Sequence, residues 1–127
     1  MAAELILIVE DDERSSKLLR DVLQFHGYRT VEATTGEDGL DLARSEHPEL
    51  ILMDIRLPGI NGEDAMVRLR IDPDTADIPI IAVTASVMRG DEQRLRRVGF
   101  DGYIPKPIDV VTFPTLVRGF LDSGRVA

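Results

Sequence analysis

The sequence predicts an α/β fold in which five parallel strands form one sheet between two layers of helices. Short apolar runs of strand length alternate along the chain with amphipathic stretches of helical period. Strands that are apolar throughout are typical of a parallel sheet covered on both faces. Right-handed crossovers place helices on both faces, so we expect a doubly wound three-layer sandwich.

The strands are expected where apolar and β-branched residues concentrate. They are Leu5 to Val9, Tyr28 to Glu32, Leu50 to Met53, Ile78 to Val83 and Gly102 to Ile104. The second run is the weakest of the five, because polar residues interrupt it.

Capping residues, glycine and proline mark the ends of the expected helices. The helices run from Glu13 to His26, from a Thr34–Glu37 capping box to His47, from Gly62 to Asp72, from Asp91 to Gly99, and from a start after Lys106 toward Leu121. The last helix has two possible starts. If Asp109 caps it, Pro114 lies about five residues in, where proline removes a backbone hydrogen bond. Either Thr112 is the cap and Pro114 lies in the first turn, or the helix is kinked.

Composition excludes several classes of protein. The 127 residues are expected to form one domain, residues 1–127, without an output domain. A net charge of −8 argues against nucleic acid as a direct partner, because phosphate binding needs a basic face. The absence of cysteine excludes disulfides and thiolate metal sites. No signal peptide or apolar run of membrane-spanning length is found, so we expect a cytoplasmic protein without membrane insertion.

Ligands of doubly wound sheets bind at the carboxyl ends of the strands. The chemically active residues that follow the expected strands are Glu10, Asp11, Asp12, Asp54, Thr84, Ala85 and Lys106. Clustered carboxylates need a cation, and oxygen ligands without His or Cys favour Mg²⁺. With a lysine and a hydroxyl to bind an anion, this set supports phosphoryl transfer with Asp54 as the nucleophile.

Four stretches of the chain resemble a known family. LILIVEDDE, LILMDIRLPGING, IIAVTAS and YIPKPI occur in the order and spacing of two-component response-regulator receiver domains. The resemblance covers essentially the whole chain and implies a flavodoxin-like (βα)5 fold with strand order 2-1-3-4-5. The stretch AVTASVMRGDE is most similar to the single-domain cell-division regulators of the DivK type.

The resemblance implies a metal site and a phosphoacceptor. Asp54 resembles the phosphoacceptor, Asp11 the direct Mg²⁺ ligand and Glu10 the water-mediated one, while the backbone carbonyl of Arg56 completes the ligand set. Mn²⁺ is expected to substitute for Mg²⁺. Asp12 could compete with Asp11 as the ligand, but only the spacing from Asp11 to Asp54 matches the family. We therefore assign Asp12 to the N-cap of the first helix.

The resemblance also implies roles beyond the acidic residues. Thr84, the backbone amide of Ala85 and Lys106 resemble the groups that bind the phosphoryl oxygens. The peptide bond between Lys106 and Pro107 is expected to be cis, a geometry largely confined to proline. Tyr103 resembles the aromatic residue that rotates in the family's conformational switch.

A phosphorelay follows from these roles. A histidine kinase or histidine phosphotransferase would donate the phosphoryl group, and a downstream protein partner would bind the changed surface. The protein is expected to catalyse only its own phosphoryl transfer and slow self-dephosphorylation, with Arg56 and Ser86 setting the lifetime of the phosphoryl group.

Three rival functions fit the sequence less well. A phosphatase of the haloacid-dehalogenase type needs an aspartate at the position of Arg56. A flavin-binding electron carrier needs a Ser/Thr/Gly-rich phosphate loop where EDDER would repel phosphate. A receiver that only binds partners has no support, because every key position is filled.

Overall fold

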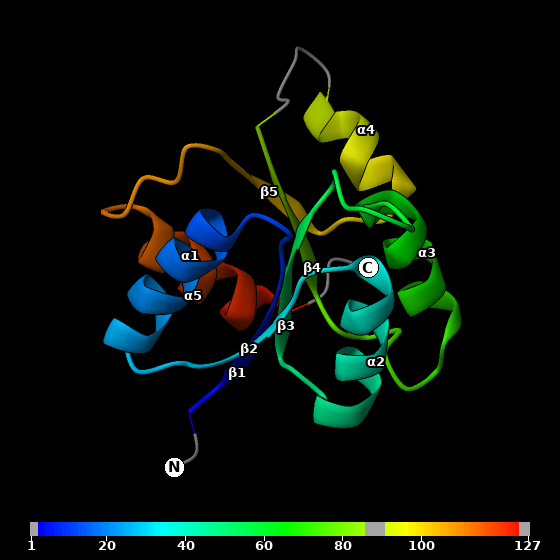
Figure 1. The fold of residues 1–127 in the computed structure, drawn as a ribbon, viewed down its shortest axis with the longest axis horizontal. Coiled ribbons are helices and arrows are strands. Elements are labelled where there is room, and N and C mark those ends of the chain that lie inside the picture. Colours follow the sequence, from blue (N-terminus) through cyan, green and yellow to red (C-terminus); the bar gives the residue numbers. More distant parts are fainter. Residues whose placement is uncertain (1–2, 86–90, 125–127) are drawn as a thin grey trace.

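Five parallel strands form the central layer of the molecule (Figure 1). The structure, a computed structural model, describes residues 3–85 and 91–124. Its strands are β1 (Leu5–Val9), β2 (Arg29–Ala33), β3 (Leu50–Asp54), β4 (Ile80–Thr84) and β5 (Gly102–Pro105). They are arranged in the order β2-β1-β3-β4-β5, which confirms the predicted topology.

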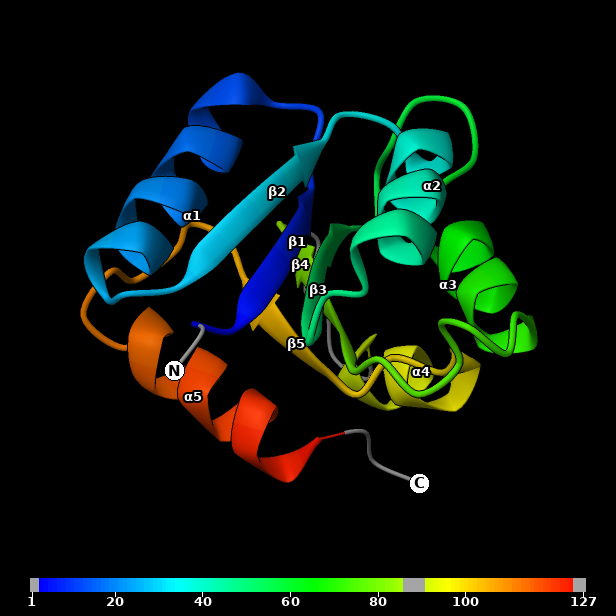
Figure 2. The ribbon, with the colours of Figure 1, turned by 90° about the horizontal axis from the view of Figure 1, so that it is seen from below.

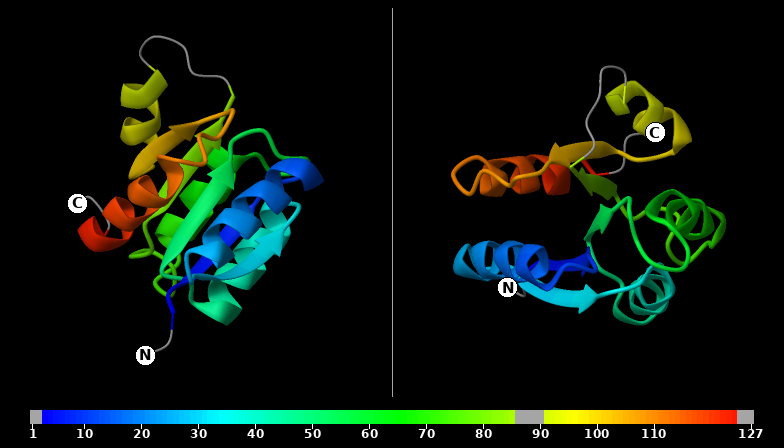
Figure 3. Two further views of the ribbon diagram at one scale, coloured as in Figure 1. Left: turned by 90° about the vertical axis from the view of Figure 1, so that its left-hand side faces the viewer. Right: turned by 45° about the horizontal axis from the view of Figure 1, so that its top comes forward.

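Helices cover both faces of this sheet. They are α1 (Glu13–Phe25), α2 (Gly36–Glu46), α3 (Gly62–Ile71), α4 (Asp91–Val98) and α5 (Phe113–Ser123). Figures 2 and 3 show α1 and α5 on one face and α2, α3 and α4 on the other, as expected for a three-layer sandwich. Within the described part of the chain, no helix is both long and apolar enough to cross a membrane.

The apolar strands bury side chains on both faces. In β1, Ile6 and Ile8 belong to the core under α1 and α5, which also contains Phe113. Their neighbour Leu7 belongs to the core under α2, α3 and α4, together with Met66. Side chains of a strand alternate between its two faces, so a strand with both faces buried must be apolar throughout.

The first turn of α2 begins one residue later than predicted. Thr35, not Thr34, is the N-cap, and its hydroxyl oxygen accepts a hydrogen bond from the Asp38 amide at 3.1 Å. The pairing of β2 with β1 explains the shift, because Ala33 is in register with Val9 and the chain remains extended up to this point. The capping box predicted at Thr34 and Glu37 was therefore wrong by one position.

The start of α5 resolves the two alternatives left by the sequence. Thr112 occupies the N-cap position and Pro114 lies in the first turn. Asp109 instead closes the preceding turn, where its carboxylate accepts a hydrogen bond from the Val111 amide at 2.9 Å. Because the first helical amides have no intrahelical acceptor, Pro114 disrupts no hydrogen bond there.

Candidate functional site

The predicted site residues meet at the carboxyl edge of the sheet. Asp54 is the last residue of β3 and lies in register with Val83. Thr84 is the last residue of β4, and its carbonyl oxygen accepts a hydrogen bond from the amide of Lys106 at 2.9 Å. Glu10 directly follows β1. Parallel strands therefore bring together residues that are far apart in the sequence.

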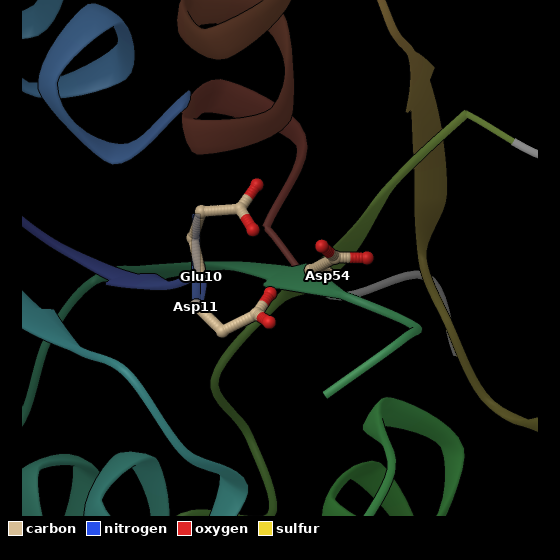
Figure 4. Close-up of side chains that lie close together, drawn as sticks. All are labelled: Glu10, Asp11 and Asp54. Carbon is tan, nitrogen blue, oxygen red and sulfur yellow. The ribbon is translucent and has the colours of Figure 1, made fainter. Parts of the chain in front are cut away.

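Three carboxylates form a cluster at this edge (Figure 4). One oxygen atom from each of Glu10, Asp11 and Asp54 lies within 4.8 Å of the others. The Glu10 side chain is 2 % exposed and that of Asp54 is 11 % exposed, whereas Asp11 is open to solvent. Two partly or fully buried acids and one exposed acid thus surround a point that a cation could reach from outside.

Lys106 is the cation that the structure places against the cluster. Its Nζ bonds to Oε1 of Glu10 and lies 3.2 Å from Oδ2 of Asp54. Together with Asp11, the described part of the chain has three carboxylates here, and the ammonium group of Lys106 pairs with two of them. The cluster therefore keeps an excess of negative charge after its internal ion pairs are formed.

The electrostatics of Glu10 reflect this excess. Burial and the hydrogen bond to Asp54 raise the pKa of Glu10 to about 7, although hydrogen bonds from Lys106 and from the amide of Asp12 oppose the shift. For Lys106, burial lowers the pKa of the amine, but the bonds to Glu10 and Asp54 outweigh it and leave the pKa raised. A second cation would relieve the repulsion between these acids.

Local hydrogen bonds orient the carboxylate of Asp54. Its Oδ1 accepts a bond from the amide of Arg56 at 3.0 Å, while its Oδ2 faces Lys106. The Arg56 side chain is exposed. In the same turn the carbonyl oxygen of Ile55 accepts a hydrogen bond from the amide of Gly62, at the start of α3. Both carboxylate oxygens of Asp54 are therefore held by groups of the chain.

The neighbouring acid Asp12 has a different role. It is the N-cap of α1, where its side chain accepts hydrogen bonds from the amide of Arg14 at 3.4 Å and from the hydroxyl of Ser15 at 2.8 Å. The bond from Ser15 lowers the pKa of Asp12. The predicted cap is confirmed, and Asp12 is not one of the three clustered acids.

The remaining candidates lie on β4, β5 and the segments that follow them. Thr84 is buried and Ala85 is exposed at the end of β4. The peptide bond between Lys106 and Pro107 is cis, as predicted. Tyr103 is half-buried and packs against the core under α2, α3 and α4. The catalytic and switch roles of these residues stay predictions, and Ser86 lies outside the described residues.

Two features of the site were not predicted from the sequence. Lys106 was expected to bind a phosphoryl group, but not to bond Glu10 as well. Gly62 was expected only to begin α3, whereas its amide bonds the turn after Asp54. The first is a contact between residues far apart in the sequence, and the second depends on how the loop between β3 and α3 folds back.

Comparison with known proteins agrees with this site. The family model of the response regulator receiver domain matches residues 6–118. The chain is 46 % identical over 116 residues to the polar-differentiation response regulator DivK of Brucella ovis, covering 91 % of this chain and 94 % of the relative. DivK of Brucella anthropi is 45 % identical over 116 residues, which again cover 91 % of this chain and 94 % of the relative.

Solved structures show the same architecture. A putative response regulator from Chloroflexus aurantiacus has a TM-score of 0.88 and 29 % identity, over 94 % of this chain and 98 % of that one. The receiver domain of a sensor histidine kinase from Pseudomonas aeruginosa has a TM-score of 0.87 and 28 % identity, over 95 % and 99 %. That structure has a magnesium ion coordinated in the active site cleft. By fold, acidic cluster and sequence match, the chain belongs to the response regulator receiver domain family, whose members signal in two-component systems.

Proposed function

We propose that the protein accepts one phosphoryl group on Asp54 in a reaction that requires a divalent cation. The supporting observation is the cluster of Glu10, Asp11 and Asp54, whose negative charge Lys106 offsets only in part. Asp54 is the member that comes from the central strand β3, between the acids after β1 and the lysine after β5. From this position it can contact a cation and a phosphoryl group together.

Mg²⁺ is the cation that fits the donor set. The described residues supply three carboxylates at the cluster, and Mg²⁺ binds through a few such oxygens while it keeps several waters. Glu10, Asp11, Asp54 and the carbonyl of Arg56 would hold it, and Mn²⁺, which accepts the same ligands, is expected to substitute. The ion supplies charge neutralisation for the phosphoryl group. The magnesium-bound receiver from Pseudomonas aeruginosa supports this assignment.

The chemical step is a displacement at phosphorus. A carboxylate oxygen of Asp54 attacks the phosphoryl group of a phosphohistidine, and the new P–O bond forms while the P–N bond breaks. The electron pair of the broken bond returns to the imidazole nitrogen, and Asp54 carries an acyl phosphate. Lys106, the hydroxyl of Thr84 and the amide of Ala85 bind the phosphoryl oxygens, so the chain contributes mainly positioning and charge.

Labelling with a small phosphodonor tests this proposal. With Mg²⁺ and acetyl phosphate, intact-mass analysis should show one added phosphoryl group, and chelation of the cation before the reaction should prevent its addition. Asp54→Asn should abolish labelling, and Asp11→Asn should abolish its metal dependence and most of the label. Asp12→Asn is the matched control, because asparagine also caps helices and the position lies outside the cluster. Equal labelling of Asp54→Asn and wild type would refute the assignment.

We further propose that the phosphodonor protein docks beside this edge, on α1 and the segment after β5. Leu18 and Val110 are 38 % and 48 % exposed there, and Phe25, at the last turn of α1, is 86 % exposed. A cavity of about 390 Å³ next to Lys106 is lined by Leu18, Ala85 and Ile108, among others. Such an apolar surface suits a helix that carries the phosphohistidine of a histidine kinase or phosphotransferase.

A comparison of two donors tests the docking surface. Phe25→Ala should slow transfer from a phosphorylated histidine phosphotransferase and leave labelling by acetyl phosphate unchanged. Ile71→Ala removes a similarly exposed apolar side chain, 76 % exposed, from α3 on the opposite face and should affect neither reaction. Equal transfer rates for Phe25→Ala and wild type would place the donor elsewhere.

We propose that phosphorylation changes the surface formed by α4, β5 and α5, and that the downstream partner binds this surface. Phosphorylation adds roughly −1.5 to −2 charge and three acceptor oxygens at Asp54. Binding of these oxygens by Thr84 and Lys106 would draw the end of β4 toward the site, and Tyr103 would turn inward. Thr84→Ala and Tyr103→Ala should therefore still accept phosphate but lose phosphorylation-dependent partner binding. Unchanged amide spectra of β5 with beryllofluoride would contradict this switch.

Two further expectations stay predictions. They are the single-domain organisation over residues 1–127 and the cytoplasmic location, which cell fractionation would test.

A further inference from the structure

The first residue of α3, Gly62, lies directly against the backbone of the proposed phosphoacceptor. A Cβ atom built on Gly62 would lie 2.4 Å from the carbonyl oxygen of Asp54 and 2.7 Å from the Cα of Ile55. The amide of Gly62 donates a hydrogen bond to the carbonyl oxygen of Ile55 at 2.8 Å. The first turn of α3 therefore touches the Asp54–Ile55 peptide with no space for a side chain.

Space, not backbone conformation, requires glycine here. Gly62 is not among the residues with positive φ, so an alanine could adopt its helical conformation. The atoms that an added methyl would meet belong to the backbone and cannot rotate away. Gly102 differs, because a Cβ there would meet the ring of Phe120 at 2.7 Å, and a side chain can move.

The peptide that Gly62 contacts leads into the turn that orients the site. The amide of Arg56 bonds Oδ1 of Asp54 at 3.0 Å, and its carbonyl is the proposed backbone ligand of the cation. On the other side, α3 is fixed to the sheet by buried Met66 and Leu69. A displacement of the first turn of α3 would therefore move the carboxylate of Asp54 and the carbonyl of Arg56 together.

We propose that Gly62 is a positioning residue for the cation and for phosphoryl transfer at Asp54. Its missing side chain lets α3 hold the Asp54–Ile55 peptide in place, so that Asp54 and the carbonyl of Arg56 face Glu10 and Asp11. This inference rests on the proposed function, since it concerns the binding of Mg²⁺ at the same cluster.

Gly62→Ala tests the inference by Mg²⁺ affinity. The variant is best made in a Gly119→Ala background, because Gly119 lies in α5 with open space around it and alanine favours a helix. We expect the Mg²⁺ affinity, measured by calorimetric titration, to fall about tenfold or more, as small displacements of reacting groups have large effects. In the metal-free protein, the amide resonances of Ile55 and Arg56 should shift.

Gly102→Ala in the same background is the matched control. It adds the same methyl group at a crowded position, against Phe120, at the opposite edge of the sheet. It should lower the melting temperature and leave the Mg²⁺ affinity unchanged. A merely structural role for Gly62 would give the same pattern in both variants, with lower melting temperatures and equal Mg²⁺ affinities.

The outcomes separate this inference from the proposed function. Failure of the Gly119→Ala parent to bind Mg²⁺ would refute the metal site itself. If the parent binds Mg²⁺ and Gly62→Ala binds it equally well, the inference is overturned and the site stands. If Gly62→Ala does not fold, the Mg²⁺ affinity of Asn61→Ala is measured instead. This substitution removes the N-cap side chain of α3, which accepts a hydrogen bond from the Asp64 amide, and adds no bulk. A weaker Mg²⁺ affinity of Asn61→Ala supports the inference, and an unchanged affinity overturns it.

Discussion

The two edges of the sheet each contain a buried ion pair, but among the described residues a cluster of three carboxylates lies only at the carboxyl edge. At the carboxyl edge, Lys106 faces Glu10 and Asp54, with Asp11 beside them. At the amino edge, Arg70 pairs with one acid, Asp101, at 2.5 Å. The side chains of this second pair are 11 % and 4 % exposed, so burial is similar at the two edges.

The amino-edge pair is also hydrogen-bonded to the backbone of several segments. The guanidinium of Arg70 also donates to the carbonyl oxygens of Ile78 at 2.6 Å and Gly99 at 3.1 Å. The carboxylate of Asp101 accepts a further bond from the amide of Ile80 at 2.9 Å. These bonds join α3 to the segments before β4 and β5.

The difference shows which buried charges indicate a ligand site. A balanced pair surrounded by backbone hydrogen bonds serves the fold, because each charge already has its partners. An excess of carboxylates at the end of parallel strands needs a cation from outside. Charge imbalance, more than burial, therefore distinguishes the carboxyl edge as the functional one.

The largest effect is expected from breaking the balanced pair. Arg70→Met should lower the free energy of unfolding by about 3 kcal/mol, because it removes the guanidinium that contacts the buried carboxylate of Asp101. The Mg²⁺ affinity should stay unchanged, since the change lies at the opposite edge. Urea unfolding and calorimetric titration measure the two quantities.

The exposed ion pair between Arg44 and Asp72 provides the control for that experiment. Arg44→Met breaks a contact of 2.7 Å whose arginine side chain is 48 % exposed, and should cost less than about 1 kcal/mol. Equal losses in the two variants would mean that the amino-edge pair is no more important than a surface ion pair.

Mg²⁺ should stabilise the fold at the unbalanced edge. A ligand that binds only the folded state adds about 2.7 kcal/mol at a concentration of one hundred times its dissociation constant. The melting temperature should therefore rise with millimolar Mg²⁺. No rise at concentrations where labelling occurs would argue against a formed metal site.

The pH dependence of the metal-free protein should reveal the burial of Glu10 beside Asp54. The pKa of Glu10 is raised from 4.5 to about 7 in the folded state, so the folded protein favours protonated Glu10. The stability that Glu10 contributes is then present below pH 4.5 and lost as the pH rises to about 7. Relative to Glu10→Gln, the wild type should become less stable over this range in urea unfolding. A constant difference between the two proteins would contradict the assignment.

Removal of one acid should change the free energy of unfolding in opposite directions at the two edges. Asp54→Asn relieves repulsion in the metal-free cluster and should raise the free energy of unfolding by about 1 kcal/mol, the size of a well-solvated interaction between unit charges. Asp101→Asn should lower it, because Arg70 then loses its counter-charge. Urea unfolding without metal measures both, and a loss of stability in Asp54→Asn would show that the carboxyl edge is balanced too.

The smallest effect on the fold is expected at Arg56. Its side chain is exposed beside Asp54, so Arg56→Ala and Arg56→Asn should leave the stability unchanged. Both should alter the lifetime of the phosphoryl group, because the side chain flanks the proposed path of the attacking water. The loss of label over time measures this, and unchanged lifetimes in both variants would exclude Arg56 from self-dephosphorylation.

The sequence was a reliable guide to the elements and to the residues at the strand ends. The alternation of apolar runs with amphipathic stretches predicted the five strands and the five helices, and the resemblance to receiver domains implied the order of the sheet. Each of these signals is local, because a strand or helix has its own period and its own capping residues. Asp12 illustrates this, since its role as an N-cap depends only on the residues that follow it.

Boundaries and contacts were less predictable. Thr35 replaced Thr34 as the cap of α2 because the register with β1 extends β2 to Ala33. The start of α5 at Thr112 could be stated only as one of two alternatives. In both cases the outcome depends on how the segment pairs or packs with distant parts of the chain.

By itself, the sequence determined the doubly wound fold, the acids and the lysine at the ends of its strands, and the resemblance to receiver domains. Only the tertiary structure decided that Lys106 bonds both Glu10 and Asp54, and that Gly62 abuts the backbone of Asp54. The physical reason is that periodicity and capping act between residues close in the chain. Ion pairing across the sheet and steric contact between α3 and the end of β3 depend instead on strand register and helix packing, which form only when the whole domain folds.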